Sequence, residues 1–466
     1  MGDRNARLWV LFIPLCYKSE NNGNLHFWFN CRFRSFWDNS VVFISPDGRT
    51  FLSRVFCNTR YDQHILPIHI NFLTFSFFIT TIHNLYIVRK TILYIMHIPF
   101  LRPPFNTQDR AAAYKAMLGS NVSTGPEIYT LEYKFAQYIK CKSALSVCNG
   151  SIALDLILQT YLRAGILKKK DTVLLPSFTF ASVANSVVNA GLTPIFCDVD
   201  RGTWNIDILS AHKYQDLYRL GAIIAVHTFG NPCNMESIVN LSNEFDALLI
   251  EDCAEACGAS FHGAKVGSFG HAATFSFNAT KNMTTGEGGM VCFNDDDPTI
   301  ALKARMLKEN GFGHTPRNVE LPGYNYRMDN IKCAIGLSQL KTLDARNQKR
   351  RINAHCLASM MEYVGLEGKI IPQTIYGDNK NAFQIFGMLV NDRDKVYDHL
   401  IKSGIEAKKY FSPAIHTQKY YHHNFVIPKL KNTDYVADHI ICLPFDDKLT
   451  TEEMVYMVER IQEVIR

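Results

Sequence analysis

Lys281 is the residue of this 466-residue chain that is best suited to covalent chemistry. It lies within TFSFNATKNMTTGEGGM (residues 274–290), where an apolar run ends in a polar turn and a glycine-rich segment follows. A lysine at the end of a buried strand is poorly solvated, which lowers the pKa of its amine and makes it a competent Schiff-base nucleophile. Most lysines are solvated surface charges, so this interpretation depends on the residues that accompany Lys281.

Asp252 follows an apolar run at residues 247–250 and precedes Lys281 in the chain. A buried carboxylate is costly unless it meets a cation, and a protonated pyridine nitrogen is such a cation. A lysine Schiff base with a carboxylate on the pyridine nitrogen is the equipment that proteins use for pyridoxal phosphate. A purely structural role for Asp252 would be the N-cap of a helix over residues 254–258.

A phosphate site is indicated where a short strand, residues 144–148, runs into a small-residue turn and a helix, residues 152–162. Backbone N–H groups of Gly150 and Ser151 would face an anion there, and the Ser276 hydroxyl could add a donor. Phe180 follows a Pro-Ser turn and could stack on a cofactor ring. A plain turn, a strand-edge hydroxyl and a core ring are the alternatives, and the joint order of these residues favours the cofactor site.

Alternating strands and helices must position these residues. Short apolar strands that alternate with helices specify a mostly parallel sheet covered on both faces. In such a sheet ligands bind at the carboxyl ends of the strands, where Asp252 and Lys281 fall. The expected strands are residues 172–175, 194–199, 222–226, 247–250 and 290–293, and the expected helices between them are residues 180–189 and 235–245.

Two domains are expected downstream of residue 95. Residues 96–345 would form a large cofactor-binding α/β domain, and residues 346–466 a smaller α+β domain. A long helical region at residues 330–364 would bridge them. The small domain would contain a strand at residues 382–390 and helices at residues 395–403 and 451–465.

Residues 1–95 differ from the rest in composition and show little periodicity. The uncharged window at residues 65–88 reaches the length of a membrane span but is diluted by polar residues. A membrane tether, a small folded module and a mis-assigned extension upstream of a natural start at Met96 are the three interpretations. We favour the third, expect no membrane association and assign residues 1–95 no function.

Composition excludes some classes of function. The net charge of +6 has no clustered basic stripe behind it, so no nucleic-acid partner is expected. Thirteen cysteines are scattered without a C-x-x-C pair, which indicates reduced thiols in a cytoplasmic setting. Cys253 and Cys257 lack a nearby histidine pair and are interpreted as packing residues, and the acidic run at residues 294–297 as a solvated turn, so no metal is expected.

Residues 96–466 resemble the DegT-type (DegT/DnrJ/StrS) sugar aminotransferases, which have the aspartate-aminotransferase-like fold type I of pyridoxal-phosphate enzymes. The matching stretches occur in the family's order. They are NGSIAL (149–154), PSFTFASVAN (176–185), PIFCDVD (194–200), AVHTFGNP (225–232), IEDCAEACGA (250–259), FSFNATKNMTTGEGGM (275–290), GYNYRMDNIKCAIGLSQL (323–340) and YFSPAIHTQKYY (410–421).

The resemblance implies a pyridoxal 5'-phosphate cofactor. It implies that Lys281 is the Schiff-base lysine and general base, that Asp252 binds the pyridine nitrogen and that Phe180 stacks on the ring. The residues implied to bind the phosphate are Gly150, Ser151 and Ser276.

Further implied residues concern the partner subunit and the substrate. Asn325 would reach the phosphate across the interface of a homodimer with shared active sites. Thr124, His416 and Tyr420 fall where the family lines its substrate pocket. Glu255, where many members have Gln or His, would lie near the 3'-oxygen of the cofactor and tune the substrate or the pKa of the Schiff base.

The expected reaction moves an amino group from glutamate to a nucleotide-linked 4-keto-6-deoxyhexose, in amino-sugar synthesis for a polysaccharide or glycoconjugate. Amination at C3 is the alternative regiochemistry. A cofactor-dependent sugar dehydratase and a non-catalytic regulatory relative are two competing hypotheses for the function. A dehydratase branch of the family replaces the lysine with histidine, so Lys281 favours transamination.

Overall fold

The computed structural model describes residues 10–18, 25–35 and 38–44, and residues 96–465 apart from 215–219, 314 and 316–317. The chain divides into two compact units, Met1–Leu93 and Tyr94–Arg466. Each unit has sheets of its own.

The N-terminal unit contains a three-stranded antiparallel sheet in the order β1-β2-β3, with β1 at Val10–Lys18, β2 at Leu25–Ser35 and β3 at Asp38–Ile44. The sequence interpretation, which found little strand periodicity here, did not anticipate these strands. They are rich in the β-branched and aromatic residues that strands favour, without strict alternation. The apolar window at residues 65–88 lies outside the described residues. None of the helices in the described part of the chain has the length and apolar character that a bilayer span requires.

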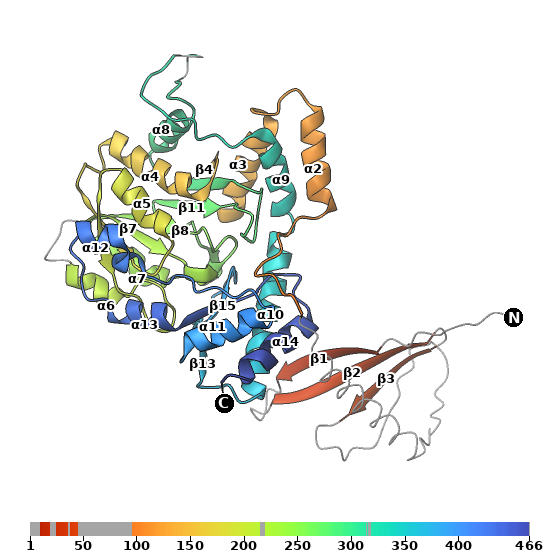
Figure 1. The fold of residues 1–466 in the computed structure, drawn as a ribbon. Helices are drawn as coiled ribbons and strands as arrows, with labels where there is room; N and C mark the ends of the chain where they lie inside the picture. The colour runs from red at the N-terminus through yellow and green to blue at the C-terminus, as the bar shows by residue number, and fades with distance from the viewer. Residues whose placement is uncertain are drawn as a thin grey trace, which may run out of the picture. The chain divides into compact units, whose positions relative to one another are not determined.

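A seven-stranded sheet forms the centre of the second unit, in the order β4-β12-β11-β8-β7-β5-β6 (Figure 1). The pairs from β11 to β6 are parallel, and β12 runs antiparallel to both β11 and β4. The expected mostly parallel sheet is therefore confirmed. The strands are β4 (Ser143–Val147), β5 (Thr172–Pro176), β6 (Thr193–Cys197), β7 (Leu220–Val226), β8 (Leu248–Asp252), β11 (Ala272–Ser276) and β12 (Gly289–Phe293).

Helices cover both faces of this sheet because successive side chains of each strand point to opposite faces. Leu145 of β4 packs in the core under α4, α5 and α8, whereas the preceding residue, Ala144, packs in the core with α3. A further core lies under α6 and α7. The helices of this domain are α2 (Thr107–Leu118), α3 (Pro126–Ile139), α4 (Gly150–Ala164), α5 (Ala181–Asn189), α6 (Ile208–Ala211), α7 (Met235–Glu244), α8 (Pro298–Lys308) and α9 (Asn330–Leu340).

A second core lies around a three-stranded antiparallel sheet, β13-β14-β15. Ile98 belongs to this core and its N–H donates to the Gly404 carbonyl at 2.9 Å, so the first residues of the unit pack with the small domain and not, as expected, with the large one. The elements of this region are α10 (Leu343–Tyr363), β13 (Ile370–Pro372), β14 (Phe386–Val390), α11 (Arg393–Lys402), α12 (Lys419–Asn424), α13 (Lys431–His439), β15 (Ile440–Leu443) and α14 (Thr451–Gln462).

The predicted long helix at residues 330–364 is two helices, α9 and α10, and the break falls at Lys341 and Thr342. Arg346 stabilises the break, because its guanidinium donates to the Thr342 hydroxyl at 2.7 Å and to the Gln339 carbonyl at 3.1 Å. In Figure 1, α10 runs from the region of the large sheet to the small one. The strand predicted over residues 382–390 begins later, at Phe386, because Gln384 pairs with another loop.

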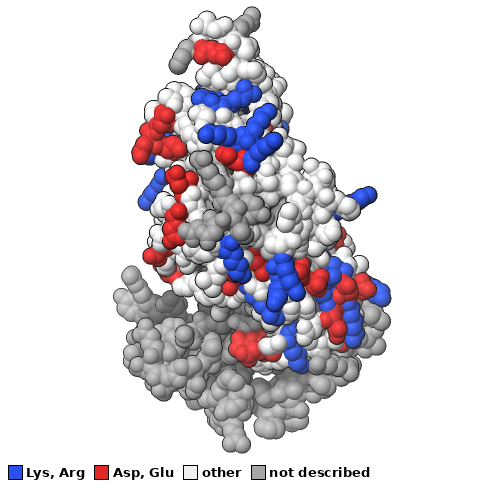
Figure 2. Space-filling view, turned by 90° about the vertical axis from the view of Figure 1, so that its left-hand side faces the viewer, with Lys and Arg blue, Asp and Glu red and all other residues white. Residues whose placement is uncertain are grey.

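Basic and acidic side chains are intermingled over the face drawn in Figure 2. A different arrangement of charges lies inside the large domain, where Glu132 of α3 is buried with Lys308 of α8. The Lys308 amine donates to Glu132 Oε1 at 2.8 Å and to the Ser146 carbonyl at 3.0 Å, and Arg305 donates to Glu132 Oε2 at 2.7 Å. Burial by itself raises the pKa of Glu132, but Lys308 and Arg305 outweigh burial and hold this pKa below 4.5.

Replacing Glu132 with glutamine should lower the free energy of unfolding by about 3–5 kcal/mol, because buried Lys308 would lose its closer counter-charge and keep only Glu309 Oε1 at 3.7 Å. The folded-state pKa of Glu132 is depressed, so its contribution is present above pH 4.5 and is lost as the pH falls through the folded-state pKa. Chemical denaturation across this pH range measures the difference between variant and wild type, which should shrink in acid. Asp296→Asn, which changes an exposed carboxylate, is the control, and an equal loss in both variants would contradict the prediction.

Candidate active site

The first turn of α4 forms one wall of the site. Asn149 caps this helix, and its side chain accepts a hydrogen bond from the Ile152 N–H at 2.9 Å. The first N–H groups of a helix have no intrahelical partners, and the helix dipole adds positive potential there. Gly150 and Ser151, the predicted phosphate-binding residues, occupy this turn. The turn therefore has the geometry of an anion site.

Ser276 lies directly against Gly150. A Cβ atom on Gly150 would come within 2.7 Å of the Ser276 Cβ, closer than real Cβ contacts, and within 3.1 Å of its Oγ. The Thr274 hydroxyl donates to the Gly150 carbonyl at 3.2 Å and joins the same turn to β11. Glycine is thus required at position 150, and the structure brings the Ser276 hydroxyl beside the N-terminus of α4, as the sequence predicts.

Asp252 ends β8 and is buried opposite Thr274 of the neighbouring β11. Burial raises the pKa of Asp252, and the Ala254 N–H and the charge of Lys281 act against that effect. Asp252 Oδ1 accepts from the Ala254 N–H at 2.9 Å, but residues 254–258 form turns and not the helix that an N-cap role would require. A buried acid with one local hydrogen bond and a nearby lysine is suited to bind a cationic ring nitrogen.

Lys281 lies in the loop between β11 and β12, with its side chain largely buried. Its Nζ is 3.5 Å from Glu255 Oε1, and Glu255 Oε2 accepts from the Phe229 N–H at 3.0 Å. The charge of Lys281 also lowers the pKa of Asp252. Lys281, Glu255 and Asp252 therefore belong to one site. Glu255 therefore lies beside the amine that the sequence singles out.

Phe180 precedes α5 and leaves 61% of its surface exposed, which is unusual for a large apolar side chain in a folded domain. Its ring centroid lies 6.5 Å from that of Phe411, which in turn lies 5.6 Å from the ring of Phe229. Phe180, Phe411 and Phe229 thus form a chain of ring contacts, and Phe229 bonds to Glu255 through its N–H. The exposed face of Phe180 can stack on a planar ligand.

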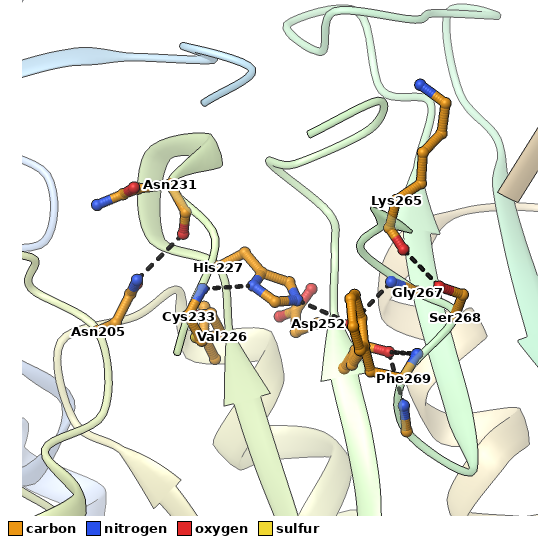
Figure 3. Close-up of polar contacts among 12 residues, drawn as sticks. Asn205, Val226, His227, Asn231, Cys233, Asp252, Lys265, Gly267, Ser268 and Phe269 are labelled. Atoms are coloured by element: carbon orange, nitrogen blue, oxygen red, sulfur yellow. Dashed lines mark hydrogen bonds and ion pairs between the residues drawn. The ribbon is translucent and has the colours of Figure 1, made fainter. Parts of the chain in front are cut away.

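His227, Glu251 and Cys253 form a buried group whose ligand atoms lie within 4.8 Å of one another. His227 Nε2 lies 3.1 Å from Glu251 Oε2, and the Cys233 N–H donates to His227 Nδ1 at 3.0 Å (Figure 3). The carboxylate also accepts from three backbone N–H groups, those of Gly267, Phe269 and Gly270. Both ring nitrogens of His227 and the carboxylate of Glu251 thus have protein partners, and these bonds connect the ends of β7 and β8 to the loop at residues 267–270.

His416, a predicted substrate residue, has protein partners at both ring nitrogens. It is buried, its Nδ1 lies 2.7 Å from Ser177 Oγ, and its Nε2 lies 3.0 Å from Asp434 Oδ1. The His416 N–H also donates to Ser177 Oγ. Burial lowers the pKa of the imidazole, and Asp434 acts against burial. Both ring nitrogens face protein, so His416 braces the turn before Phe180 and does not offer a free nitrogen to a substrate.

The other predicted substrate and interface residues are exposed. Thr124 lies in the loop before α3, and Tyr420 lies on α12 with 54% of its surface exposed. Asn325 is exposed beside Tyr326, whose carbonyl accepts from the Cys148 N–H at 2.9 Å. Asn325 is thereby placed near the start of α4. The roles of these three residues stay predictions.

Pyridoxal phosphate has four features that a protein must meet, and the described residues fit each of them. The phosphate fits the first turn of α4 beside Ser276, where only glycine leaves room at position 150. The protonated ring nitrogen fits the buried carboxylate of Asp252. The aldehyde fits the amine of Lys281, and the exposed Phe180 ring suits the face of the pyridine.

Sequence reasoning missed residues that hold this site together. Phe229 binds Glu255 through its backbone, and Gln384 and Asn282 hold the loop that carries Lys281. Asn282 carried a signal, because it adjoins Lys281 in the chain. Phe229 lies within the matching stretch at residues 225–232, but Gln384 lies in none, and its contacts are with residues distant in sequence.

A mostly parallel, doubly covered sheet with a lysine and a buried aspartate at its carboxyl edge defines the fold-type I pyridoxal-phosphate aminotransferases. Residues 105–462 match the model of the DegT/DnrJ/EryC1/StrS aminotransferase family, and the chain belongs to this family. Its members depend on pyridoxal phosphate, so the chain is a pyridoxal-phosphate-dependent sugar aminotransferase.

Named relatives and solved structures agree with this placement. The chain is 33% identical to the GDP-perosamine synthase of Escherichia coli O157:H7 over 377 residues, which are 79% of this chain and 98% of the relative. It is 34% identical to that of Caulobacter vibrioides over 351 residues, which are 74% and 91%. An aminotransferase structure from Psychrobacter cryohalolentis superposes with a TM-score of 0.72 at 29% identity, covering 78% of this chain and 98% of that one.

Proposed function

We propose that the protein transfers an amino group from glutamate to a nucleotide-linked 4-keto-6-deoxyhexose. The observation that carries the proposal is the grouping of Lys281, Asp252 and Glu255. Thr274, which pairs with Asp252, connects this group to Gly150 in the first turn of α4. Two relatives that are over 30% identical are named for the synthesis of a GDP-linked sugar, which supports a nucleotide-linked acceptor and makes GDP the first nucleotide to test. Amination at C3 is the alternative.

Three parts of the chain would hold and orient the cofactor. The N–H groups of Gly150 and Ser151 and the Ser276 hydroxyl would bind the phosphate. Asp252 would keep the ring nitrogen protonated, because a carboxylate in a buried site strongly favours an adjacent positive charge. Phe180 would cover one face of the ring and exclude water from it. When bound, pyridoxal phosphate withdraws electrons from the donor's Cα–H bond and so makes that proton removable.

Lys281 and Glu255 would move and hold the proton. With an amino donor in the site, the free Nζ of Lys281 would accept the proton from the donor's Cα and would deliver it to the former aldehyde carbon, on the other side of the donor nitrogen. Glu255 Oε1, 3.5 Å away, would stabilise the ammonium formed on Nζ. In the second half-reaction Lys281 and Glu255 would carry out the same proton transfers in the opposite direction, and the keto-sugar would take up the amino group.

A homodimer with shared sites and a cytoplasmic setting complete the proposal. The exposure of Asn325 near the start of α4 supports its reach to a neighbouring subunit. No disulfide joins the cysteines among the described residues of the second unit, which fits a reducing compartment.

The test incubates the purified protein with nitrogen-15-labelled glutamate and a panel of nucleotide-linked keto-sugars that differ in nucleotide and in keto position. The expected product carries the label at C4 of the sugar. Label at C3 would support the alternative regiochemistry, and a modified sugar without nitrogen would support a lyase or dehydratase. A protein that binds pyridoxal phosphate but consumes no sugar in the panel would refute the proposed acceptor.

A further inference from the structure

The two chain neighbours of Lys281 are both held by one distant, buried segment, residues 381–384. The Gln384 side-chain amide donates to the Thr280 carbonyl on one side of Lys281. On the other side, the Asn282 amide donates to the Ala382 carbonyl at 2.7 Å. The backbone of Lys281 is therefore tied before and after the residue to the same segment.

Gln384 is also connected to the carboxylate that faces Lys281. Its N–H donates to the Phe229 carbonyl at 3.0 Å, and the Phe229 N–H donates to Glu255 Oε2 at 3.0 Å. Glu255 Oε1 then lies 3.5 Å from the Lys281 amine. Gln384 thus reaches one partner of the Lys281–Glu255 pair through Thr280 and the other through Phe229.

The segment that carries Gln384 is itself firmly held. Gln384 is 3% exposed, and Arg350 of α10 is 1% exposed. Arg350 Nη1 donates to the Phe383 carbonyl at 3.0 Å and to the Phe445 carbonyl at 3.2 Å. Among the described residues Gln384 Oε1 has no hydrogen-bond partner, so the bond from its amide nitrogen to the Thr280 carbonyl is the side-chain contact that a shift of this buried group would break.

We propose that Gln384 is a positioning residue for transamination, which fixes the Lys281 amine against Glu255 although it need not touch the substrate. The inference rests on the proposed role of Lys281. Residues 381–384 lead directly into β14, which belongs to the core of the small domain. The hydrogen bonds of this segment therefore connect that core to the backbone of Lys281.

The experiment replaces Gln384 with methionine, which keeps the length of the side chain and removes its hydrogen bonds. A small misalignment of a catalytic group costs on the order of 10²-fold in rate, so kcat should fall roughly 10- to 100-fold while the KM for glutamate stays within about twofold. The second readout is a pH titration of the cofactor's visible absorbance in the holoenzyme without substrates. Its midpoint should shift, because the Lys281 amine would lose its fixed distance to Glu255.

The matched control is Gln462→Met, which removes an exposed hydrogen bond to the Val364 carbonyl and should behave as wild type. If Gln384→Met does not fold, Asn282→Ser tests the same segment from the other side of Lys281. This variant should show the same fall in kcat at unchanged KM and the same shift in the midpoint of the absorbance titration. Wild-type kcat and titration in the folded variant would overturn the inference, as would a fall in kcat without a shifted titration.

Lys281→Ala separates this inference from the function on which it rests. If that variant keeps the wild-type absorbance, the role of Lys281 is wrong whatever the Gln384 variants do. If Lys281→Ala loses the absorbance and the Gln384 variants are unchanged, the positioning inference alone is wrong.

Discussion

Replacing Lys281 with alanine is expected to lower kcat by roughly 10⁴-fold and to abolish the visible absorbance that its covalent link to the cofactor produces. The physical reason is that Lys281 would supply both the Schiff base and the amine that carries the proton. Glu255, 3.5 Å away, cannot replace an amine that forms a covalent bond. Steady-state kinetics and absorbance spectra of the purified holoenzyme measure the two effects.

Lys303→Ala is the control for this prediction, because the Lys303 amine donates to an exposed carbonyl, that of Arg163 on α4, away from the site. It should retain wild-type kcat and absorbance. A Lys281→Ala enzyme that turns over at the wild-type rate would mean that another residue carries the chemistry.

Asp252→Asn should lower kcat on the order of 10²- to 10³-fold, since a neutral amide cannot keep the ring nitrogen of the cofactor protonated. The same change should not destabilise the cofactor-free protein. The folded-state pKa of Asp252 is raised, so its ionisation opposes folding increasingly as the pH rises from 3.8 through the folded-state pKa. At neutral pH, the cofactor-free variant should therefore unfold at the same or a higher temperature than wild type.

Kinetics of the loaded enzyme and thermal unfolding of the cofactor-free protein check this pair of effects. The exposed Asp438 provides the control, and Asp438→Asn should change neither quantity. A parallel loss of kcat and stability in Asp252→Asn would point to a structural role for Asp252 and would contradict its pairing with the ring nitrogen.

The central sheet and the grouping of the site residues could be predicted because local patterns determine them. Apolar strands alternate with helices, and the carboxyl ends of parallel strands meet at one edge. Asp252 and Ser276 end neighbouring strands, so their proximity follows from strand order. Gly150 joins them because β4 lies in the same sheet, separated from β11 by β12.

What could not be predicted depends on contacts between distant residues. The sequence places His416 in a matching stretch but does not reveal that Ser177 and Asp434 bind its two ring nitrogens. It does not show that Ile98 packs in the small domain, because that depends on a bridge to Ile405. Helical periodicity at residues 330–364 continues across Lys341 and Thr342, so the break between α9 and α10 also leaves no local sign.

The register of β11 with its neighbours β8 and β12 determines where the candidate cofactor-binding side chains lie. Thr274 pairs with Asp252 on one side of β11, and Ser276 pairs with Gly289 on the other. Adding one residue within β11 would turn every following side chain to the opposite face, so the contact of Ser276 with Gly150 would be lost while Asp252 kept its place. Extra residues at Gly286, whose surroundings are open, would leave both pairings intact. Length variation is therefore tolerable at Gly286 and harmful within β11, which ends at Ser276.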